Sequence, residues 1–211
     1  MASVVAFVPA IEHMFELAPD YALRAYLFSN VSNGEALRDM LKPLDTTESS
    51  GGGGKSLAGT ACIDGGLVAF VDVDVLAGPL TLLAAANKAV VSHVEGTRKT
   101  ESLATECLYN LSASKSINFA LKTFGSNART TRVAAVIFEH RQGAASAQGE
   151  EKVLSAVQGS AVAPDAAAAV WEKSPEKLEA IKKLYKVTDT ALKLATIDDA
   201  AALRVAMRDV K

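Results

Sequence analysis

The residue types in this chain that could perform chemistry are a glycine-rich segment and scattered carboxylates, imidazoles and amines. The segment Gly51–Ser56 ends in Gly-Lys-Ser, as phosphate-binding loops do. Such a loop needs another glycine five residues before the glycine of that tripeptide, but Ser49 stands there. No apolar strand precedes the segment to hold its amides against a phosphate. The composition therefore favours a flexible insert over a nucleotide site.

The remaining candidate groups are isolated from one another. Asp72 and Asp74 alternate at a strand end, but two carboxylates alone make a weak cation site, so we expect solvation or capping of the next helix. No Gly-x-Ser-x-Gly elbow is present to support a hydrolase. The histidines have no paired spacing that would favour a metal centre: His13, His93 and His140. We expect no catalytic residue, no metal and no cofactor, hence a binding protein rather than an enzyme.

The charge of the chain is nearly balanced overall but locally basic. A formal net charge of −2 excludes a globally basic nucleic-acid binder. Between Asn87 and Arg132, however, seven basic residues stand against three acidic ones. Among them Lys88, Arg98 and Lys99 flank the end of an expected helix and the loop after it. There they could bind phosphate oxygens or only complement the helix dipole, and the sequence supports both interpretations equally.

The length and composition indicate one well-packed domain. The chain has 211 residues and an apolar content of 49%, which suffices for a sizeable core. Cys62 and Cys107 have no paired spacing, so neither a disulfide framework nor a zinc pattern is predicted. The first residues lack the basic start of a signal peptide, and no apolar run is long enough to span a membrane. A reducing cytosolic or nuclear setting follows as an expectation.

The periodicity of apolar residues predicts the elements that position these groups. Runs of β-branched and aromatic residues predict strands at Val4–Val8, Ala22–Phe28, Leu67–Val71 and Arg132–His140. Helical spacing and capping residues predict helices after a Ser32–Glu35 capping box, at Leu80–Val94, Ser102–Leu111 and Ile117–Phe124, after Ser174, and at Ile197–Met207. We expect a mobile glycine-rich insert at about 45–56 and a loop at about 141–151.

One polar residue falls inside an expected apolar stripe. The helix Leu80–Val94 should bury Leu80, Leu83, Val90, Val91 and Val94, and Asn87 lies on the same face. A buried carboxamide is costly unless it is hydrogen-bonded. We therefore expect Asn87 to have a structural role, tying this helix to a neighbouring backbone.

The order of motifs from Leu82 to Phe138 resembles one known family. The segments Ala86–Ala89, Arg98–Thr100, Glu106–Ser112 and Ile117–Gly125 occur in that order, followed by a β-rich run. This combination closely resembles the TPRKB family, the small kinase-binding subunits of the KEOPS/EKC complex. The similarity extends more weakly to 21–41 and 182–186. The insert, the 142–151 loop and an alanine-rich stretch before Trp171 depart from it.

The resemblance implies a fold and a function. Members look like a single α/β domain, which we expect to be of the α+β type with a central, mostly antiparallel sheet and helices packed around it. They are non-catalytic and regulate the PRPK-type atypical kinase. Through it they join a complex that installs threonylcarbamoyladenosine on tRNA, and they assist tRNA recruitment with contacts at its 3′ CCA end. Cytoplasm and nucleus are the implied locations.

The sequence suggests which residues would serve these roles. For tRNA the candidates are Lys88, Arg98 and Lys99. For the kinase they are Leu203 and Met207, because a helix with large apolar side chains among alanines allows close approach and a buried contact. Two alternatives stay open: a kinase-regulating adaptor that never touches RNA, and a stand-alone nucleotide-binding enzyme using Gly51–Ser56.

Overall fold

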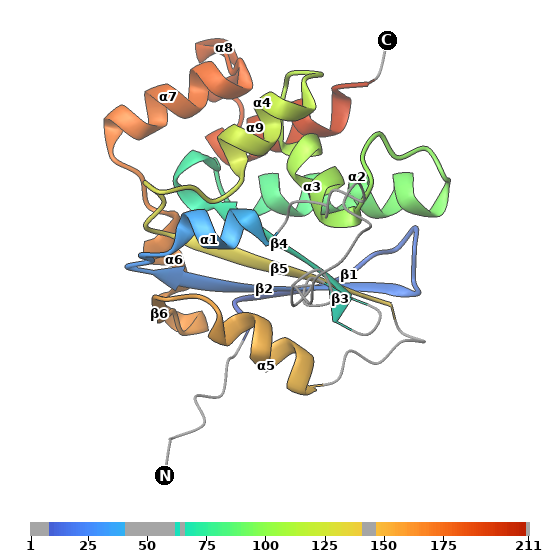
Figure 1. Ribbon diagram of the computed structural model, residues 1–211. Coiled ribbons are helices and arrows are strands. Elements are labelled where there is room, and N and C mark those ends of the chain that lie inside the picture. The colour runs from blue at the N-terminus through green and yellow to red at the C-terminus, as the bar shows by residue number, and fades with distance from the viewer. Residues whose placement is uncertain (1–8, 41–61, 64–65, 141–146, 210–211) are drawn as a thin grey trace.

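A computed structural model describes residues 9–40, 62–63, 66–140 and 147–209 (Figure 1). Its strands form an antiparallel sheet in the order β1-β2-β5-β4-β3, with β6 also paired to β2. The strands are β1 Ile11–Met14, β2 Tyr21–Ser29, β3 Cys62–Ile63, β4 Gly66–Asp72, β5 Val133–His140 and β6 Ser160–Ala161. The expected single α+β domain with an antiparallel sheet is confirmed. The strand expected at Val4–Val8 and the insert at 45–56 lie outside the described residues.

The helices lie on both faces of this sheet, and Figure 1 shows α5 on one side with α2, α3 and α9 on the other. They are α1 Gly34–Asp39, α2 Pro79–Val94, α3 Leu103–Leu111, α4 Ile117–Phe124, α5 Ala147–Ser155, α6 Ala167–Trp171, α7 Pro175–Tyr185, α8 Asp189–Leu192 and α9 Ile197–Met207. Short 3₁₀ turns occur at Val73–Val75 and Pro164–Ala166. The expected helices Ile117–Phe124 and Ile197–Met207 are confirmed to the residue, and the one after Ser174 begins with the predicted serine cap.

The alternation of residues along the central strands separates two hydrophobic cores. In β2, Leu23, Ala25 and Leu27 belong to a large cluster with α2, α3, α7 and α9. The intervening Tyr26 and Phe28 belong to a smaller cluster with α1 and α5. Successive side chains of a strand point to opposite faces, so a strand buried on both faces contributes to two cores. Both faces of the central strands are therefore covered.

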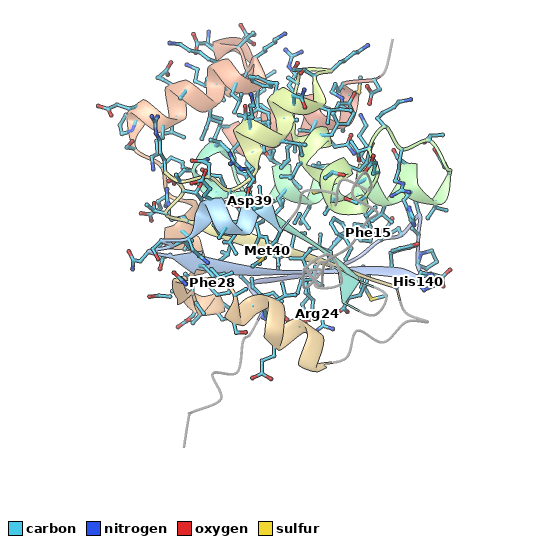
Figure 2. All side chains as sticks on the ribbon, in the orientation of Figure 1. Phe15, Arg24, Phe28, Asp39, Met40 and His140 are labelled. Atoms are coloured by element: carbon cyan, nitrogen blue, oxygen red, sulfur yellow. The ribbon has the colours of Figure 1, made fainter. Side chains whose placement is uncertain are left out.

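The structure corrects the predicted loop at about 141–151. Residues 141–146 lie outside the described part of the chain, but α5 begins at Ala147. Val153 and Leu154 are buried in the smaller cluster. Arg24 of β2, labelled in Figure 2, points from the sheet. It pairs with Glu150 of α5 at 2.9 Å and also contacts Glu139 of β5. The helix is thus stabilised by tertiary contacts that its polar, glycine-containing sequence does not indicate.

The capping box predicted at Ser32–Glu35 is wrong. The N-cap of α1 is Asn33, with no side-chain capping bond. The Ser32 hydroxyl instead donates to the carbonyl of Gln158 at 3.4 Å, and Glu35 pairs with Arg38 at 3.3 Å. The side chain and backbone amide of Ser32 both contact the segment after α5, so tertiary partners replace the local cap.

The apolar face predicted for α2 is correct at Val90 but wrong at both ends of the helix. Leu80 and Val94 are exposed, at 44% and 56% of their surface. The buried positions are Thr81, Leu82, Ala85, Ala86, Ala89 and Val90. The buried side of the helix therefore combines three alanines with Thr81, Leu82 and Val90.

Candidate functional site

Helix α9 lies parallel to α2, and polar contacts join both ends of the pair. At one end the Asp198 carboxylate accepts from the amides of Leu80 at 2.9 Å and Thr81 at 2.8 Å, and from the Thr81 hydroxyl at 2.6 Å. At the other end the Lys88 ammonium donates to the carbonyl of Val205 at 3.3 Å. The start of α2 therefore lies beside the start of α9.

Asp198 supplies a cap that the start of α2 lacks. The N-cap residue is Gly78, which has no side chain to bond the free amides of the first turn. A Cβ atom at Gly78 would lie 2.3 Å from the Asp198 carboxylate, so the glycine leaves room for the substitute. The carboxylate also lies in the first turn of α9. It thus complements the positive dipole ends of two helices.

Alanines are frequent on the buried sides of both helices, together with Leu82, Val90 and Val205, whereas two large apolar side chains of α9 are exposed. Ala85, Ala86 and Ala89 of α2 are buried, as are three alanines of α9. On the outer side of α9, Leu203 and Met207 are 62% and 51% exposed. The two residues predicted to contact a partner therefore lie on the exposed side of α9, whose opposite side is buried in the protein.

Arg208 joins the end of α9 to the end of α3. Its guanidinium donates to the carbonyls of Tyr109 at 2.6 Å and Ser112 at 3.2 Å, and to the Asn110 side chain at 2.8 Å. It also lies 4.1 Å from the centroid of the Tyr109 ring. Only 5% of the side chain is exposed. The last carbonyls of a helix lack intrahelical partners, and this arginine provides them.

Asp209 completes this cluster and pairs with both neighbouring cations. Its carboxylate lies 2.7 Å from the Lys88 ammonium and 3.1 Å from the Arg208 guanidinium. Although partial burial opposes it, hydrogen bonds from Arg208 and Lys88 lower the pKa of Asp209 to about 2. The carboxylate is therefore ionised at any physiological pH. Sequence reasoning missed Asp198, Arg208 and Asp209, because their partners are about 100 residues or more away.

The loop between α2 and α3 (residues 95–102) forms a second candidate surface, and we call its cationic part, residues 97–100, the basic loop. Glu106 of α3 is 2% exposed and accepts from the amides of Lys99 at 3.0 Å and Thr100 at 2.9 Å. The Thr100 hydroxyl donates to the same oxygen at 2.8 Å. A buried carboxylate thus holds the loop in place. From the sequence, Glu106 could be placed on this helix one turn before Asn110, but not as the support of the loop.

The three cations predicted to bind tRNA do not form one cluster. Arg98 and Lys99 share the basic loop, where the Lys99 side chain is exposed and Arg98 donates to the carbonyl of Glu101 at 3.1 Å. Lys88 is engaged with Val205 and Asp209. Asn87 is half-buried on α2. Its structural role stays a prediction.

The other polar candidates have structural partners. Asp72 accepts from the Asp74 amide at 2.9 Å and from the Thr130 hydroxyl at 2.7 Å, so it caps the following turn as predicted. Asp74 pairs with Arg132 and Lys177. Among the described residues, no three histidine, cysteine, aspartate or glutamate side chains gather as metal ligands, and no helix is long and apolar enough to cross a membrane.

Two of the histidines meet beside Tyr21. The ring of Tyr21 lies 5.6 Å from that of His93 and 4.9 Å from that of His140, between centroids. Burial, and then the positive charges of Arg98 and His140, lower the pKa of His93. The cluster joins the end of α2, next to the basic loop, to the end of the central strand β5, where Figure 2 labels His140.

Comparison with known proteins identifies the family of this arrangement. Residues 28–209 match the family described as kinase binding protein CGI-121. The chain belongs to the CGI-121 family. A curated relative, the EKC/KEOPS complex subunit TPRKB of Danio rerio, is 29% identical over 195 residues, which cover 92% of this chain and 95% of that protein. The family resemblance found in the sequence is confirmed, and membership in a kinase-binding family agrees with a binding protein rather than an enzyme.

Proposed function

We propose that this chain is a non-catalytic subunit of a KEOPS/EKC-type complex. In this role it binds and regulates a PRPK-type atypical kinase and assists tRNA recruitment for threonylcarbamoyladenosine modification. Support comes from its CGI-121 family membership and from its similarity over nearly full length to a protein named as a subunit of that complex. We propose the cytoplasm and nucleus as its locations.

The observation that carries the kinase-binding proposal is the exposed apolar pair on α9. Leu203 and Met207 lie one helical turn apart, so their side chains are neighbours on one surface. Large apolar side chains that enter a partner's pocket contribute much of the affinity of an interface. The buried side of α9 packs on α2 through alanines and Val205, so the outer pair is available without disturbing the core.

The experiment compares two exposed leucines in binding to the kinase. Leu203→Glu should weaken binding by about tenfold or more, because it places a carboxylate in the apolar contact. Leu17→Glu is the matched control, since Leu17 is 74% exposed in the β1–β2 connection. Titration calorimetry measures the affinities and thermal unfolding checks the fold. Equal binding of the two variants would contradict a docking surface on α9.

The tRNA part of the proposal rests on the basic loop. Arg98 and Lys99 lie on a loop whose backbone is hydrogen-bonded to the Glu106 carboxylate. Cations that bind phosphates release the counterions condensed on the nucleic acid, which favours binding. With Lys88 paired to Asp209, about two phosphate contacts are expected, hence a log–log salt slope of roughly −2 on a duplex end. A three-cation site would give a steeper slope.

A salt series with tRNA tests this part separately. Arg98→Ala/Lys99→Ala should weaken tRNA binding and flatten the salt dependence, while kinase binding stays the same. Lys122→Ala, which removes an exposed cation on α4, is the control. An unchanged slope in the double variant would favour a kinase-regulating adaptor without RNA contact. Deleting residues 49–56 tests the remaining alternative, because a nucleotide-binding enzyme would lose nucleotide binding whereas an adaptor would keep its partner.

A further inference from the structure

We infer that Asp198 and Arg208 are positioning residues, which fix α9 on α2 and α3 so that Leu203 and Met207 are presented to the partner in one arrangement. The inference rests on the proposed kinase binding and adds to it the residues that control the docking surface. Neither residue belongs to the exposed pair itself. Asp198 bonds the start of α9 to α2, and Arg208 bonds the end of α9 to α3.

Alanines occupy three of the four buried positions of α9, which suits close approach to α2, but their packing defines position along the helices weakly. Alanine side chains bury little apolar area each and have no rotamers that interlock. Hydrogen bonds are directional and fail when a helix shifts by even part of a turn. The bonds from Leu80 and Thr81 to Asp198 therefore set the register at one end of α9.

The other end is set by a buried cation. Arg208 has acceptors in the Tyr109 and Ser112 carbonyls, the Asn110 side chain and the Asp209 carboxylate. A guanidinium that is almost fully buried is costly unless such partners are in place, so it favours a single position of α9 against α3. Met207 immediately precedes Arg208, and Leu203 lies one turn earlier. The exposed pair is therefore closest to this end.

The experiment uses the full chain and the partner kinase. Arg208→Ala should weaken kinase binding by about tenfold. It should also speed amide hydrogen exchange in α9 while exchange in β2 and β5 stays the same. Arg208→Lys keeps the charge but not the planar fork, so its kinase affinity should lie between those of the wild type and Arg208→Ala. Arg204→Ala removes an exposed arginine from the same helix and should change neither measurement.

The outcomes separate this inference from the proposed function. Faster exchange in α9 with unchanged kinase affinity in Arg208→Ala overturns the positioning role, while Leu203→Glu still tests the interface. Unchanged affinity in both Arg208→Ala and Leu203→Glu overturns both. Should Arg208→Ala fail to fold, Arg208→Lys takes its place, because it keeps the charge but loses the planar fork. It should weaken binding by about threefold, and unchanged affinity in this variant also overturns the inference.

Discussion

The α9 surface and the basic loop expose opposite chemistry but are supported in the same way. One presents Leu203 and Met207 on a helix, and the other presents Arg98 and Lys99 on a loop. Each is supported by a carboxylate that accepts hydrogen bonds from two backbone amides and a threonine hydroxyl. Asp198 belongs to α9 itself and bonds to α2, whereas Glu106 belongs to the adjoining α3 and bonds to the loop.

The two supports differ in what else they join. Asp198 connects two long helices of the main core, and its partner Thr81 is fully buried. Glu106 orders a short connection whose residues are partly exposed and can hydrate when released. We therefore expect the α9 surface to depend on global packing and the basic loop to depend on local contacts, which single substitutions can separate.

The largest effect is expected from Asp198→Ala. It removes the cap of α2 and leaves the buried Thr81 hydroxyl without its carboxylate, which should cost about 2 kcal/mol of unfolding free energy. For a chain of this length that lowers the melting temperature by about 4–8 °C. Thermal unfolding measures it. Asp198→Asn, which keeps an acceptor, should lose less, and equal losses would mean that charge alone matters.

A smaller effect is expected from Glu106→Ala. The loss should be about 1 kcal/mol, because the freed amides of Lys99 and Thr100 can bond water. Hydrogen exchange should accelerate within residues 97–102 and stay unchanged in α9. Acceleration that spreads to α9 would show that the two surfaces are not independently supported.

Acidification should affect the two regions unequally. Burial lowers the folded-state pKa of His93 below the ordinary value of 6.5. Between the folded-state pKa and 6.5, the unfolded chain therefore binds more protons than the folded chain. Stability from this neutral imidazole is complete above about pH 6.5 and is lost as pH falls toward the folded pKa. Asp209, with a pKa of about 2, adds no titration there.

The measurement is thermal unfolding between about pH 7 and about pH 5, with His93→Gln as the matched variant. The wild type should lose more stability than the variant over this range, and exchange near the end of α2 should rise first. A loss that begins in α9 would contradict the comparison.

The smallest effects on stability should come from the exposed residues themselves. Leu203→Ala and Lys99→Ala should each change the unfolding free energy by less than about 0.5 kcal/mol, because neither side chain is packed in the core. Chemical denaturation measures the change. A loss as large as that of Asp198→Ala would identify Leu203 as a core residue and would remove it from the docking surface.

Local patterns in the sequence were sufficient to predict several elements and the family. Helices α4 and α9 have the predicted bounds. The residues that apolar spacing places on the inner side of α3 are buried: Leu103, Cys107, Leu108 and Leu111. In these segments apolar spacing and capping residues act within a few positions. The prediction failed for α5, for the cap at Ser32 and for both ends of the apolar face of α2, where contacts with distant segments override local preference.

The candidate site shows the same division. The sequence alone determined that Leu203 and Met207 share one face of a helix and that Arg98 and Lys99 follow a helix end, because both facts depend on spacing. Only the tertiary structure decided that Lys88 pairs with Asp209 and that Asp198 caps a helix 117 residues earlier. A carboxylate or an ammonium can satisfy its charge with whichever partner the fold brings near, and spacing along the chain does not reveal that partner.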